Sequence, residues 1–324
     1  MHLIIKACTK PLKVTALEAL LRRIPQNHPK SLQIKEELRR RTAGYRGELA
    51  VSYHLSSMPD NDFYIVYDLR LPLDNKIFQI DILLLSSNFA LIIEVKNIAG
   101  MLFFDRFHKQ FIRTKGDIKE GFPDPISQAY RLRSQLHEWI KGKFKITMPI
   151  EAVVVLSHPS SVIQTDHTRD SEVKKMVIHA EHLLEYIETM KEMYPNPIST
   201  AKTIKRLSKN LVKHHNTPTF SLQTSYQIND SEIITGVQCP HCQAIPMNRL
   251  KGRWLCSTCM KTSKEAHVKA IQDSFLLLSP TINNEQFRKF VHIQSKDTAY
   301  KLLTSMNLPH NGHTKGRVYF SPSE

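Results

Sequence analysis

The chain has 324 residues, enough for two or three domains, and its 41% hydrophobic and 8% aromatic content is typical of a globular protein. It contains no apolar run of about 18 residues, and charge interrupts its first residues too early for a signal peptide, so we expect a cytoplasmic protein without a membrane span. The net charge of +15 and the pI near 9.6 favour a polyanionic partner. Nucleic acid is favoured over an anionic membrane surface.

The positive charge is uneven along the chain. Residues 196–324 hold 17 Lys and Arg against 7 Asp and Glu, whereas residues 1–195 hold 28 against 23. The smaller C-terminal part is therefore the more basic. The five cysteines do not suit a secreted disulfide fold, and four of them form two C-x-x-C pairs, which indicates metal binding in a reducing compartment.

Two helices are predicted before the first long strand, at residues 15–24 and 30–54. Gly44 and Gly47 each weaken the longer helix by about 1 kcal/mol relative to alanine, so we expect them to permit close approach of a backbone or a phosphate. Glu48 follows directly. It is either a solvated helix carboxylate, which this motif alone favours, or a third acid that reaches a metal site on the sheet.

The stretch from Gln79 to Lys96 predicts two buried strands joined by a turn at residues 86–88. Three charged residues, Asp81, Glu94 and Lys96, interrupt its apolar runs. A buried charge is costly unless it is paired or bound to a metal. Glu94 and Lys96 point to the same face, because side chains alternate along a strand. Two carboxylates and an ammonium are therefore expected at one point of an apolar sheet.

Such an arrangement suits metal-assisted hydrolysis of a phosphodiester. Asp81 and Glu94 can hold a hard divalent cation, which polarises the phosphodiester and lowers the pKa of a bound water. Lys96 can position or activate that water and offset charge on the pentavalent phosphate. The alternative is a structural ion pair between Lys96 and one of the two acids.

The remaining elements of this region predict an α/β domain with a mixed central sheet and helices on its faces. Gln128 lies near the start of one predicted helix, where the N-terminus favours phosphate, although a solvated polar side chain is the simpler explanation. Strands are predicted at residues 62–71, 100–105, 110–114 and 151–157, and helices at residues 126–142, 181–194 and 198–215.

Five segments in this order resemble the nuclease-related domain, NERD, over roughly residues 40–160. They are G-E-L-A-V, Q-I-D-I-L-L-L, I-I-E-V-K-N, P-I-S-Q-A-Y-R-L-R-S-Q-L and E-A-V-V-V-L-S-H-P. NERD is grouped with the PD-(D/E)xK nucleases of restriction-endonuclease-like fold. The resemblance implies a Mg²⁺- or Mn²⁺-dependent nuclease and favours DNA over RNA as substrate. It implies these roles: Asp81 and Glu94 as metal ligands, Lys96 as the catalytic lysine, Glu48 as an accessory acid and Gln128 as a helix residue that faces the site.

Two C-x-x-C pairs, Cys239 with Cys242 and Cys256 with Cys259, are separated by 13 residues. This spacing predicts a tetrahedral zinc site in a zinc ribbon. A redox dithiol is the alternative, but it normally uses a single pair in a βαβ setting. Zinc would serve here as a folding device, because so small a module buries little core.

The last segment predicts two helices followed by a short strand, with Ser295 as the N-cap of the second helix. This order resembles a helix-turn-helix with a wing. In that interpretation Lys296, Thr298 and Lys301 face DNA. The alternative is a plain helical hairpin that packs on the ribbon or on a partner.

These patterns together predict six segments: an N-terminal helical extension (1–38), a NERD nuclease-like domain (39–160), a helical segment packed on it (161–215), a linker (216–236), a Cys₄ zinc ribbon (237–265) and a helix-turn-helix-like module (280–324). The leading hypothesis is a metal-dependent deoxyribonuclease with C-terminal nucleic-acid-binding modules. Two alternatives remain, a non-catalytic DNA-binding or regulatory protein on a nuclease-like scaffold and a zinc-ribbon scaffold for protein partners. No G-x-x-x-x-G-K-[ST] stretch is present, so a motor activity would come from a helicase-type partner, and a homo-oligomer stays open.

Overall fold

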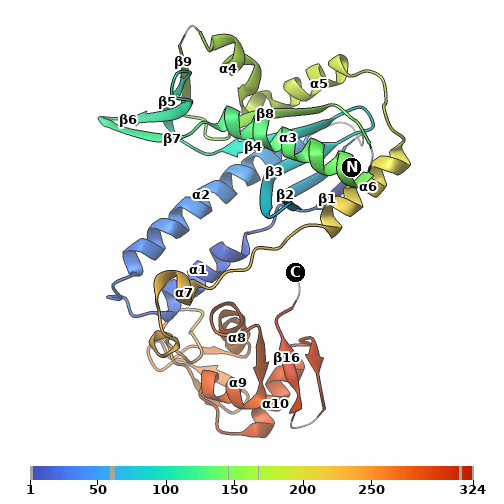
Figure 1. Ribbon diagram of the computed structural model, residues 1–324. Helices are drawn as coiled ribbons and strands as arrows, with labels where there is room; N and C mark the ends of the chain where they lie inside the picture. Colours follow the sequence, from blue (N-terminus) through green and yellow to red (C-terminus); the bar gives the residue numbers. More distant parts are fainter. Residues whose placement is uncertain (1–2, 59–62, 145, 167, 314–315, 323–324) are drawn as a thin grey trace. The chain divides into compact units, whose positions relative to one another are not determined.

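The computed structural model describes residues 3–58, 63–144, 146–166, 168–313 and 316–322. The chain divides into two compact units, residues 1–10 with 41–218 and residues 11–40 with 219–324 (Figure 1). No helix in these ranges is both long and apolar enough to cross a membrane.

Six strands form the central sheet of the first unit, in the order β1-β2-β3-β4-β8-β10. The neighbours β2, β3 and β4 are antiparallel, whereas β1 with β2, β4 with β8 and β8 with β10 are parallel. The predicted mixed sheet is therefore confirmed. The bounds are β1 (Leu3–Lys6), β2 (Tyr64–Leu73), β3 (Lys76–Leu85), β4 (Ala90–Lys96), β8 (Ile150–Leu156) and β10 (Val177–His179). Residue 62, the first of the strand predicted at residues 62–71, lies outside the described residues.

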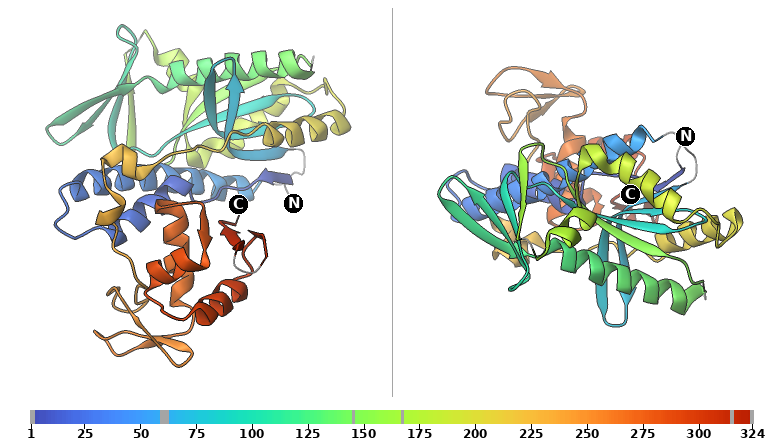
Figure 2. Two further views of the ribbon diagram at one scale, coloured as in Figure 1. Left: turned by 60° about the horizontal axis from the view of Figure 1, so that its bottom comes forward. Right: turned by 90° about the horizontal axis from the view of Figure 1, so that it is seen from above.

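Helices cover both faces of this sheet, as predicted. One hydrophobic cluster joins alternate strand residues to α3 (Pro125–Phe144) and α6 (Ala201–Lys213). A second cluster joins the opposite face to the C-terminal part of α2 (Ser31–Ser56) and to α5 (Leu183–Met193). Figure 2 shows α3 and α2 on opposite sides of the strands. The amphipathic pattern of α3 explains its place, because its apolar side chains from Ile126 to Ile140 are the buried ones.

A second, four-stranded sheet of the first unit, here called the arm, has the order β7-β6-β5-β9. Its core side chains Phe104 and Phe111 are buried, with ring centroids 4.9 Å apart. The predicted strands β5 (Gly100–Asp105) and β6 (Gln110–Lys115) are confirmed, whereas β7 (Ile118–Pro123) and β9 (Ser161–Thr165) were not predicted, since both are short and largely polar. Helix α4 (Asp170–Met176) leads from the arm back to β10.

The second unit combines helices with two small antiparallel sheets. One hydrophobic cluster contains residues of the cysteine pairs and of the C-terminal helices, so the predicted ribbon and helix-turn-helix residues share a core. The elements are α1 (Leu12–Arg23), α7 (Leu222–Tyr226), β11 (Asn248–Leu250), β12 (Arg253–Leu255), β13 (Thr262–Ser263), α8 (Ala266–Leu277), β14 (Thr281–Asn283), α9 (Asn284–Val291), α10 (Lys296–Ser305), β15 (His310–Asn311) and β16 (Val318–Phe320).

A buried ion pair ties α1 to α8 in this unit. Arg23 and Asp273 are both fully buried, and Arg23 Nε donates a 3.0 Å hydrogen bond to Asp273. The Arg23 guanidinium also donates to the carbonyls of Ile234 and Gly236. Residues 222–233, placed in the predicted linker, pack against α1 as well, because their apolar side chains, Leu222 among them, are buried there.

Candidate functional site

The charged residues of the predicted hairpin lie where β3 and β4 separate. The antiparallel ladder between these strands ends with Ile82 opposite Ile93. Beyond that pair, the Val95 amide donates a 2.9 Å hydrogen bond to Asp81 Oδ2. The Asp81 carboxylate thus accepts the hydrogen bond that a neighbouring strand would otherwise accept from the β4 backbone. This hydrogen bond holds Asp81 beside Glu94.

A change of face in β3 creates this opening. Ile80 and Leu83 contact the same hydrophobic cluster although they are three residues apart, whereas strict alternation would put them on opposite faces. On the neighbouring strand β2, Asp68 occupies the corresponding unpaired position and has a φ of 46°. Local irregularities of this kind re-aim side chains and are over-represented near active sites. Here the irregularity directs Asp81 towards the end of β4.

Lys96 joins the site from β4 and is held by two partners. Its Nζ lies 2.6 Å from Glu94 Oε1 and donates a 3.2 Å hydrogen bond to Gln128 Oε1 on α3. Glu94 is only 2% exposed, and its second oxygen, Oε2, is buried without a hydrogen-bond partner. The structure therefore brings together Glu94, Lys96 and Gln128, as the sequence predicts, and leaves one buried carboxylate oxygen for a further partner.

Gly47 lets helix α2 approach the ends of β4 and β8. A Cβ at this position would lie 2.7 Å from Asn97 Cβ and 2.8 Å from Ser157 Oγ, so these neighbours would have to shift. Asn97 Nδ2 also donates a 2.7 Å hydrogen bond to the Ala43 carbonyl. The predicted close approach is confirmed at Gly47, whereas a Cβ at Gly44 would meet nothing within 4 Å.

This contact places Glu48 among the acids of the sheet rather than in open solvent. Burial, the negative charge of Asp68 and the charge of Glu94 raise the pKa of Glu48 to about 7, against an opposing effect of Lys6. Burial and the charges of Glu94 and Glu48 likewise raise the pKa of Asp81 well above its ordinary value. Glu48 is half-buried here, and its charge and that of Glu94 act on Asp81.

The donor set at this opening suits a hard divalent cation. Asp81 and Glu94 offer carboxylate oxygens, including the unpartnered Glu94 Oε2. Among the described residues, the four cysteines are the one group of three or more side chains close enough together to hold a metal ion. Asp81 and Glu94, without a third such side chain, are therefore the described residues that could hold a divalent cation at this opening.

The sequence-based interpretation missed a second layer of this site. Lys6 on β1 donates hydrogen bonds of 3.1 and 3.0 Å to the carbonyls of Tyr67 and Asp68 and lies 3.4 Å from the Asp68 carboxylate. Asp68 in turn accepts a 2.9 Å hydrogen bond from Gln79. The position of Asp68 could have been found in the sequence, because it is an aspartate within a strand of aromatic and β-branched residues. No pattern in the sequence indicated Lys6, which is far away along the chain.

Two glycine substitutions separate the packing role of α2 from its helix propensity. We expect Gly47→Ala to lower the free energy of unfolding by about 1–3 kcal/mol, since the new methyl group must displace the β4 and β8 ends. Gly44→Ala, in open space on the same helix, should raise it by about 0.5–1 kcal/mol. Urea unfolding monitored by circular dichroism measures both. Equal effects of the two changes would contradict the close approach.

The stability of the metal-free protein should fall as the pH rises. The pKa of Glu48 is about 7 in the fold against an ordinary value of 4.5, so the folded state binds the proton more tightly. This contribution is complete below pH 4.5 and is lost as the pH passes the folded value. We expect Glu48→Gln to raise the melting temperature in EDTA at about pH 8 more than at about pH 5. The exposed Glu36→Gln change on the same helix is the control, and an equal response of both variants would contradict the assignment.

The four cysteines of the second unit form a separate candidate metal centre. Their Sγ atoms lie within 4.8 Å of one another, with 3.6 Å between Cys239 and Cys259 and 3.4 Å between Cys242 and Cys256. A tetrahedron with metal–sulfur distances of about 2.3 Å has sulfur–sulfur edges of about 3.8 Å, so the arrangement fits a Cys₄ zinc site.

The two cysteine turns have the same backbone geometry. The residue four positions after the first cysteine of each pair, Gln243 or Met260, has a left-handed φ of 64° or 57° and donates its amide to that cysteine's carbonyl. The Cys259 amide and, to a smaller extent, the Thr258 amide donate hydrogen bonds towards Cys256. These hydrogen bonds lower the pKa of Cys256 to about 6. This favours the thiolate form of Cys256, whereas at Cys242 the Ala244 amide lowers the pKa but the contact with Cys256 and burial raise it to about 12.

One of the predicted DNA-facing residues, Lys296, lies at a polar cavity of the C-terminal helices. Lys296 lines this cavity of about 470 Å³ together with Arg288, Arg317 and two tyrosines. Lys301 is exposed, and the Ser295 hydroxyl accepts the Thr298 amide as the predicted N-cap. Three cations and two carboxylates, Glu285 and Asp297, thus line this cavity beside the N-termini of α9 and α10.

Comparison with known proteins identifies a family match within the first unit. Residues 43–157 match the family model of the nuclease-related domain, NERD, so the resemblance inferred from the sequence is confirmed for this region. No curated protein matches the chain. Among solved structures, the protein VC1899 from Vibrio cholerae is similar at 13% sequence identity with a TM-score of 0.26. The similarity covers 56% of this chain and 51% of that protein, so the chain spans about half its length.

Proposed function

Because residues 43–157 form a nuclease-related domain, we propose that this protein is a metal-dependent nuclease that hydrolyses phosphodiester bonds of DNA. The proposed reacting site contains Asp81, Glu94 and Lys96, on a sheet of the restriction-endonuclease-like kind. One observation supports it above all. Glu94 is buried, pairs with Lys96 through one oxygen and keeps its other oxygen unpartnered, an arrangement that costs stability unless a further cation completes it.

In this proposal Asp81 and Glu94 hold Mg²⁺ or Mn²⁺. The bound ion supplies Lewis-acid polarisation of the phosphodiester and a water of lowered pKa. The Asp81 carboxylate is oriented for this task by the Val95 amide. Lys96 positions Glu94 through their ion pair.

Lys96 has a second task in the reaction. An ammonium has three N–H donors, of which Glu94 and Gln128 take two. The Lys96 side chain is 22% exposed, so the third donor can reach the attacking water or a phosphate oxygen. There it offsets the negative charge that develops on the phosphate. Glu48, with a pKa of about 7, can accept or return a proton near neutral pH.

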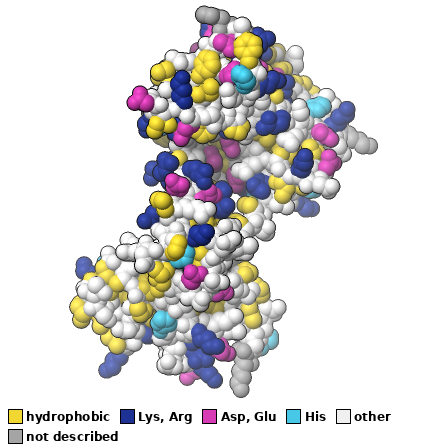
Figure 3. Space-filling view, turned by 60° about the vertical axis from the view of Figure 1, so that its left-hand side comes forward, with side chains coloured by type: hydrophobic (Ala, Val, Ile, Leu, Met, Phe, Trp, Pro, Cys, Tyr) yellow, Lys and Arg dark blue, Asp and Glu magenta, His cyan; other side chains and the backbone are white. Residues whose placement is uncertain are grey.

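Affinity for the substrate comes from the basic surface in this proposal. Lys and Arg side chains occur over both units on the face drawn in Figure 3. The second unit contributes the cations that line its polar cavity, with Lys296 and Arg288 among them. Its helices α9 and α10 would act as a helix-turn-helix-like module, and the Cys₄ centre as a structural zinc site. Such phosphate contacts make binding strongly salt-dependent.

A cleavage assay tests the proposal. Supercoiled, linear and single-stranded DNA, with RNA alongside, are incubated with the purified protein and Mg²⁺ or Mn²⁺. We expect cleavage of a DNA form, inhibited by EDTA and lost in Asp81→Asn. Absence of cleavage on every substrate, or full activity of Asp81→Asn, would overturn it.

A non-catalytic nucleic-acid-binding protein on the same scaffold is the second candidate. The specific observation in its favour is that Lys96 and Glu94 form a close ion pair of 2.6 Å, as in the structural alternative to a catalytic site. A salt-dependent gel shift by a protein that cuts nothing would support this alternative. The same assay therefore separates the two functions.

A further inference from the structure

The arm is inserted between the two elements that carry Lys96 and Gln128. Strand β4 ends at Lys96, β5 begins at Gly100, and β7 ends at Pro123 immediately before α3. Figure 1 shows these strands extending from one end of the central sheet. Their packed aromatic core indicates a formed structure rather than a loose loop.

The turn that joins β5 to β6 presents an aromatic side chain to solvent. This turn, here called the tip, consists of Arg106, Phe107, His108 and Lys109, and Phe107 is 83% exposed. An exposed phenylalanine contributes little to folding, since its apolar surface stays in water. Cations on both sides of an exposed aromatic ring are the composition of surfaces that bind single-stranded nucleic acid.

Asp105 fixes the conformation of the tip. Its carboxylate accepts a 3.0 Å hydrogen bond from the Phe107 amide and a 3.1 Å hydrogen bond from the Gln110 side chain. His108 Nδ1 lies 2.8 Å from the same carboxylate. The ring of Phe107 is therefore held outwards by a preorganised turn, which reduces the entropy lost when a ligand binds.

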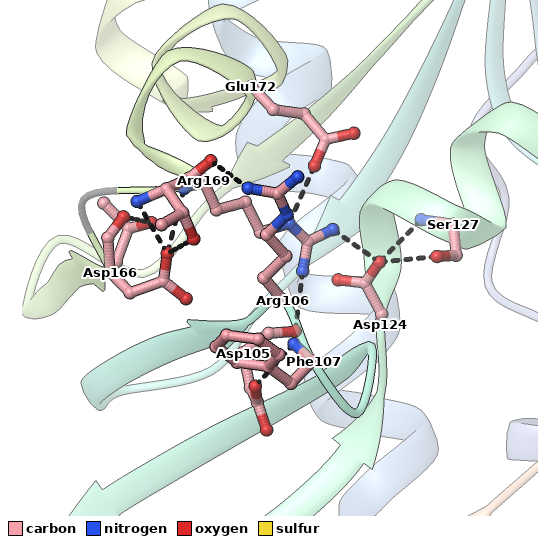
Figure 4. A network of polar contacts seen from close by, with 10 residues as sticks. Asp105, Arg106, Phe107, Asp124, Ser127, Asp166, Arg169 and Glu172 are labelled. Carbon is pink, nitrogen blue, oxygen red and sulfur yellow. Dashed lines mark hydrogen bonds and ion pairs between the residues drawn. The ribbon is translucent and has the colours of Figure 1, made fainter.

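Arg169 links this turn to the N-terminus of α3 (Figure 4). It is 5% exposed, and its Nη1 donates to the Asp105 carbonyl at 3.1 Å while its Nη2 donates to Asp124 at 2.8 Å. Asp124 also accepts the amide and hydroxyl of Ser127, in the first turn of α3. Burying an arginine costs desolvation free energy, which the several hydrogen bonds of Arg169 offset. Here these bonds fix the tip relative to the helix that carries Gln128.

A cavity of about 320 Å³ lies between the tip and α3. Arg106, Lys109 and Arg169 line it together with a single carboxylate, Glu172, which already pairs with Arg169 at 2.7 Å. Two cations of the tip, Arg106 and Lys109, therefore dominate the charge of its lining. Arg106 is steadied there by a 3.0 Å hydrogen bond to the Thr168 carbonyl.

The cavity and the proposed reacting site lie on the same turn of α3. Ser127 lines the cavity, and its neighbour Gln128 accepts the hydrogen bond of Lys96. We propose that the tip is a substrate subsite: Phe107 stacks on an unpaired base of the nucleic-acid strand, and Arg106 and Lys109 contact the phosphate beside that base. The proposal rests on the proposed nuclease function, because the strand is the one held at Glu94 and Lys96. It assigns a preference for substrates with accessible base faces.

Phe107→Trp provides a direct reporter. The two native tryptophans, Trp139 and Trp254, are 2% and 0% exposed, so a tryptophan at position 107 would be the solvent-exposed fluorophore. The full-length variant is titrated with a short single-stranded DNA in EDTA, where a metal-dependent nuclease does not cut. We expect saturable quenching by single-stranded DNA and much less by blunt duplex DNA, because stacking requires a free base face.

Alanine substitutions at the tip measure how much each side chain contributes to the Kd for the same oligonucleotide. We expect Phe107→Ala to raise Kd about tenfold, the loss of one base–aromatic stack. Arg106→Ala with Lys109→Ala should lower the slope of log Kd against log salt by about 1.4, the value for two phosphate contacts on a single strand. Ile118→Ala is the matched control, because Ile118 is a 66% exposed apolar residue on the same arm but away from the tip.

The outcomes separate this proposal from the proposed function. Quenching together with tip-dependent binding supports the subsite even where the wild-type protein cuts no nucleic acid, and the nuclease assignment alone then fails. Cleavage by the wild type with unchanged Kd for Phe107→Ala, and no quenching in Phe107→Trp, overturns the subsite and leaves the nuclease standing. Unquenched fluorescence with equal effects of Phe107→Ala and Ile118→Ala overturns it as well and points to a protein partner for the tip.

Discussion

Lys96→Ala is expected to lower kcat for DNA cleavage by about 10³-fold, the typical effect of removing a donor aimed at developing charge. The geometry explains why the effect should be large. Lys96 is the cation paired with Glu94 at 2.6 Å, and its remaining donor is the one able to face the phosphate. A single-turnover assay at saturating protein measures the chemical step directly.

Two further variants test whether Lys96 acts by charge and position. Lys96→Arg keeps the positive charge but alters the donor geometry, so we expect partial activity. Gln128→Ala removes one hydrogen bond that positions the ammonium, and we expect about a tenfold lower rate with little change in KM. Equal activity of Lys96→Ala and the wild type would remove this residue from the mechanism.

Stability must be measured beside the rate, because Lys96 also has a structural role. Its removal leaves both oxygens of the buried Glu94 carboxylate without a cation, a change of about 3–5 kcal/mol for a buried pair. Thermal unfolding with and without Mg²⁺ separates the two effects. A folded but inactive Lys96→Ala protein that still binds DNA would show that the loss is chemical.

Cys256→Ser is expected to remove one bound zinc ion per chain and to unfold the region around the cysteine pairs. Structural zinc contributes about 10 kcal/mol or more to the folding of such sites. Cys256 is 1% exposed and shares a hydrophobic cluster with Trp254 and residues of α8 to α10. The disturbance should therefore reach the C-terminal helices, which hydrogen exchange would detect.

Cys8→Ser is the matched control for this experiment. Cys8 is the one cysteine outside the two pairs, and burial, with the charge of Glu48, raises its pKa to about 11. It is therefore a protonated thiol that should bind no metal. Elemental analysis should find zinc in the wild type and in Cys8→Ser but not in Cys256→Ser. Wild-type protein purified without zinc and with an intramolecular disulfide would instead favour the redox dithiol.

The local patterns of the sequence predict much of this structure. The apolar runs around Asp81 and Glu94 fold as adjacent strands, and the amphipathic pattern places α3 on the sheet. The C-x-x-C spacing predicts the cysteine cluster, and Ser295 caps the helix it precedes. Each of these features depends on residues a few positions apart, where the periods of helices and strands link the sequence directly to side-chain direction.

Local patterns therefore predict the longer strands and helices of the first unit, the cysteine cluster and the acids beside Lys96, but not short polar strands such as β7 and β9. Three contacts depend instead on the folded chain: Gly47 brings Glu48 to those acids, Arg23 ties α1 to α8, and Arg169 links the arm to α3. Arg169 and Asp124 are 45 residues apart along the chain, and Arg23 and Asp273 are 250 residues apart. Their positions depend on how whole elements pack, which no local period encodes.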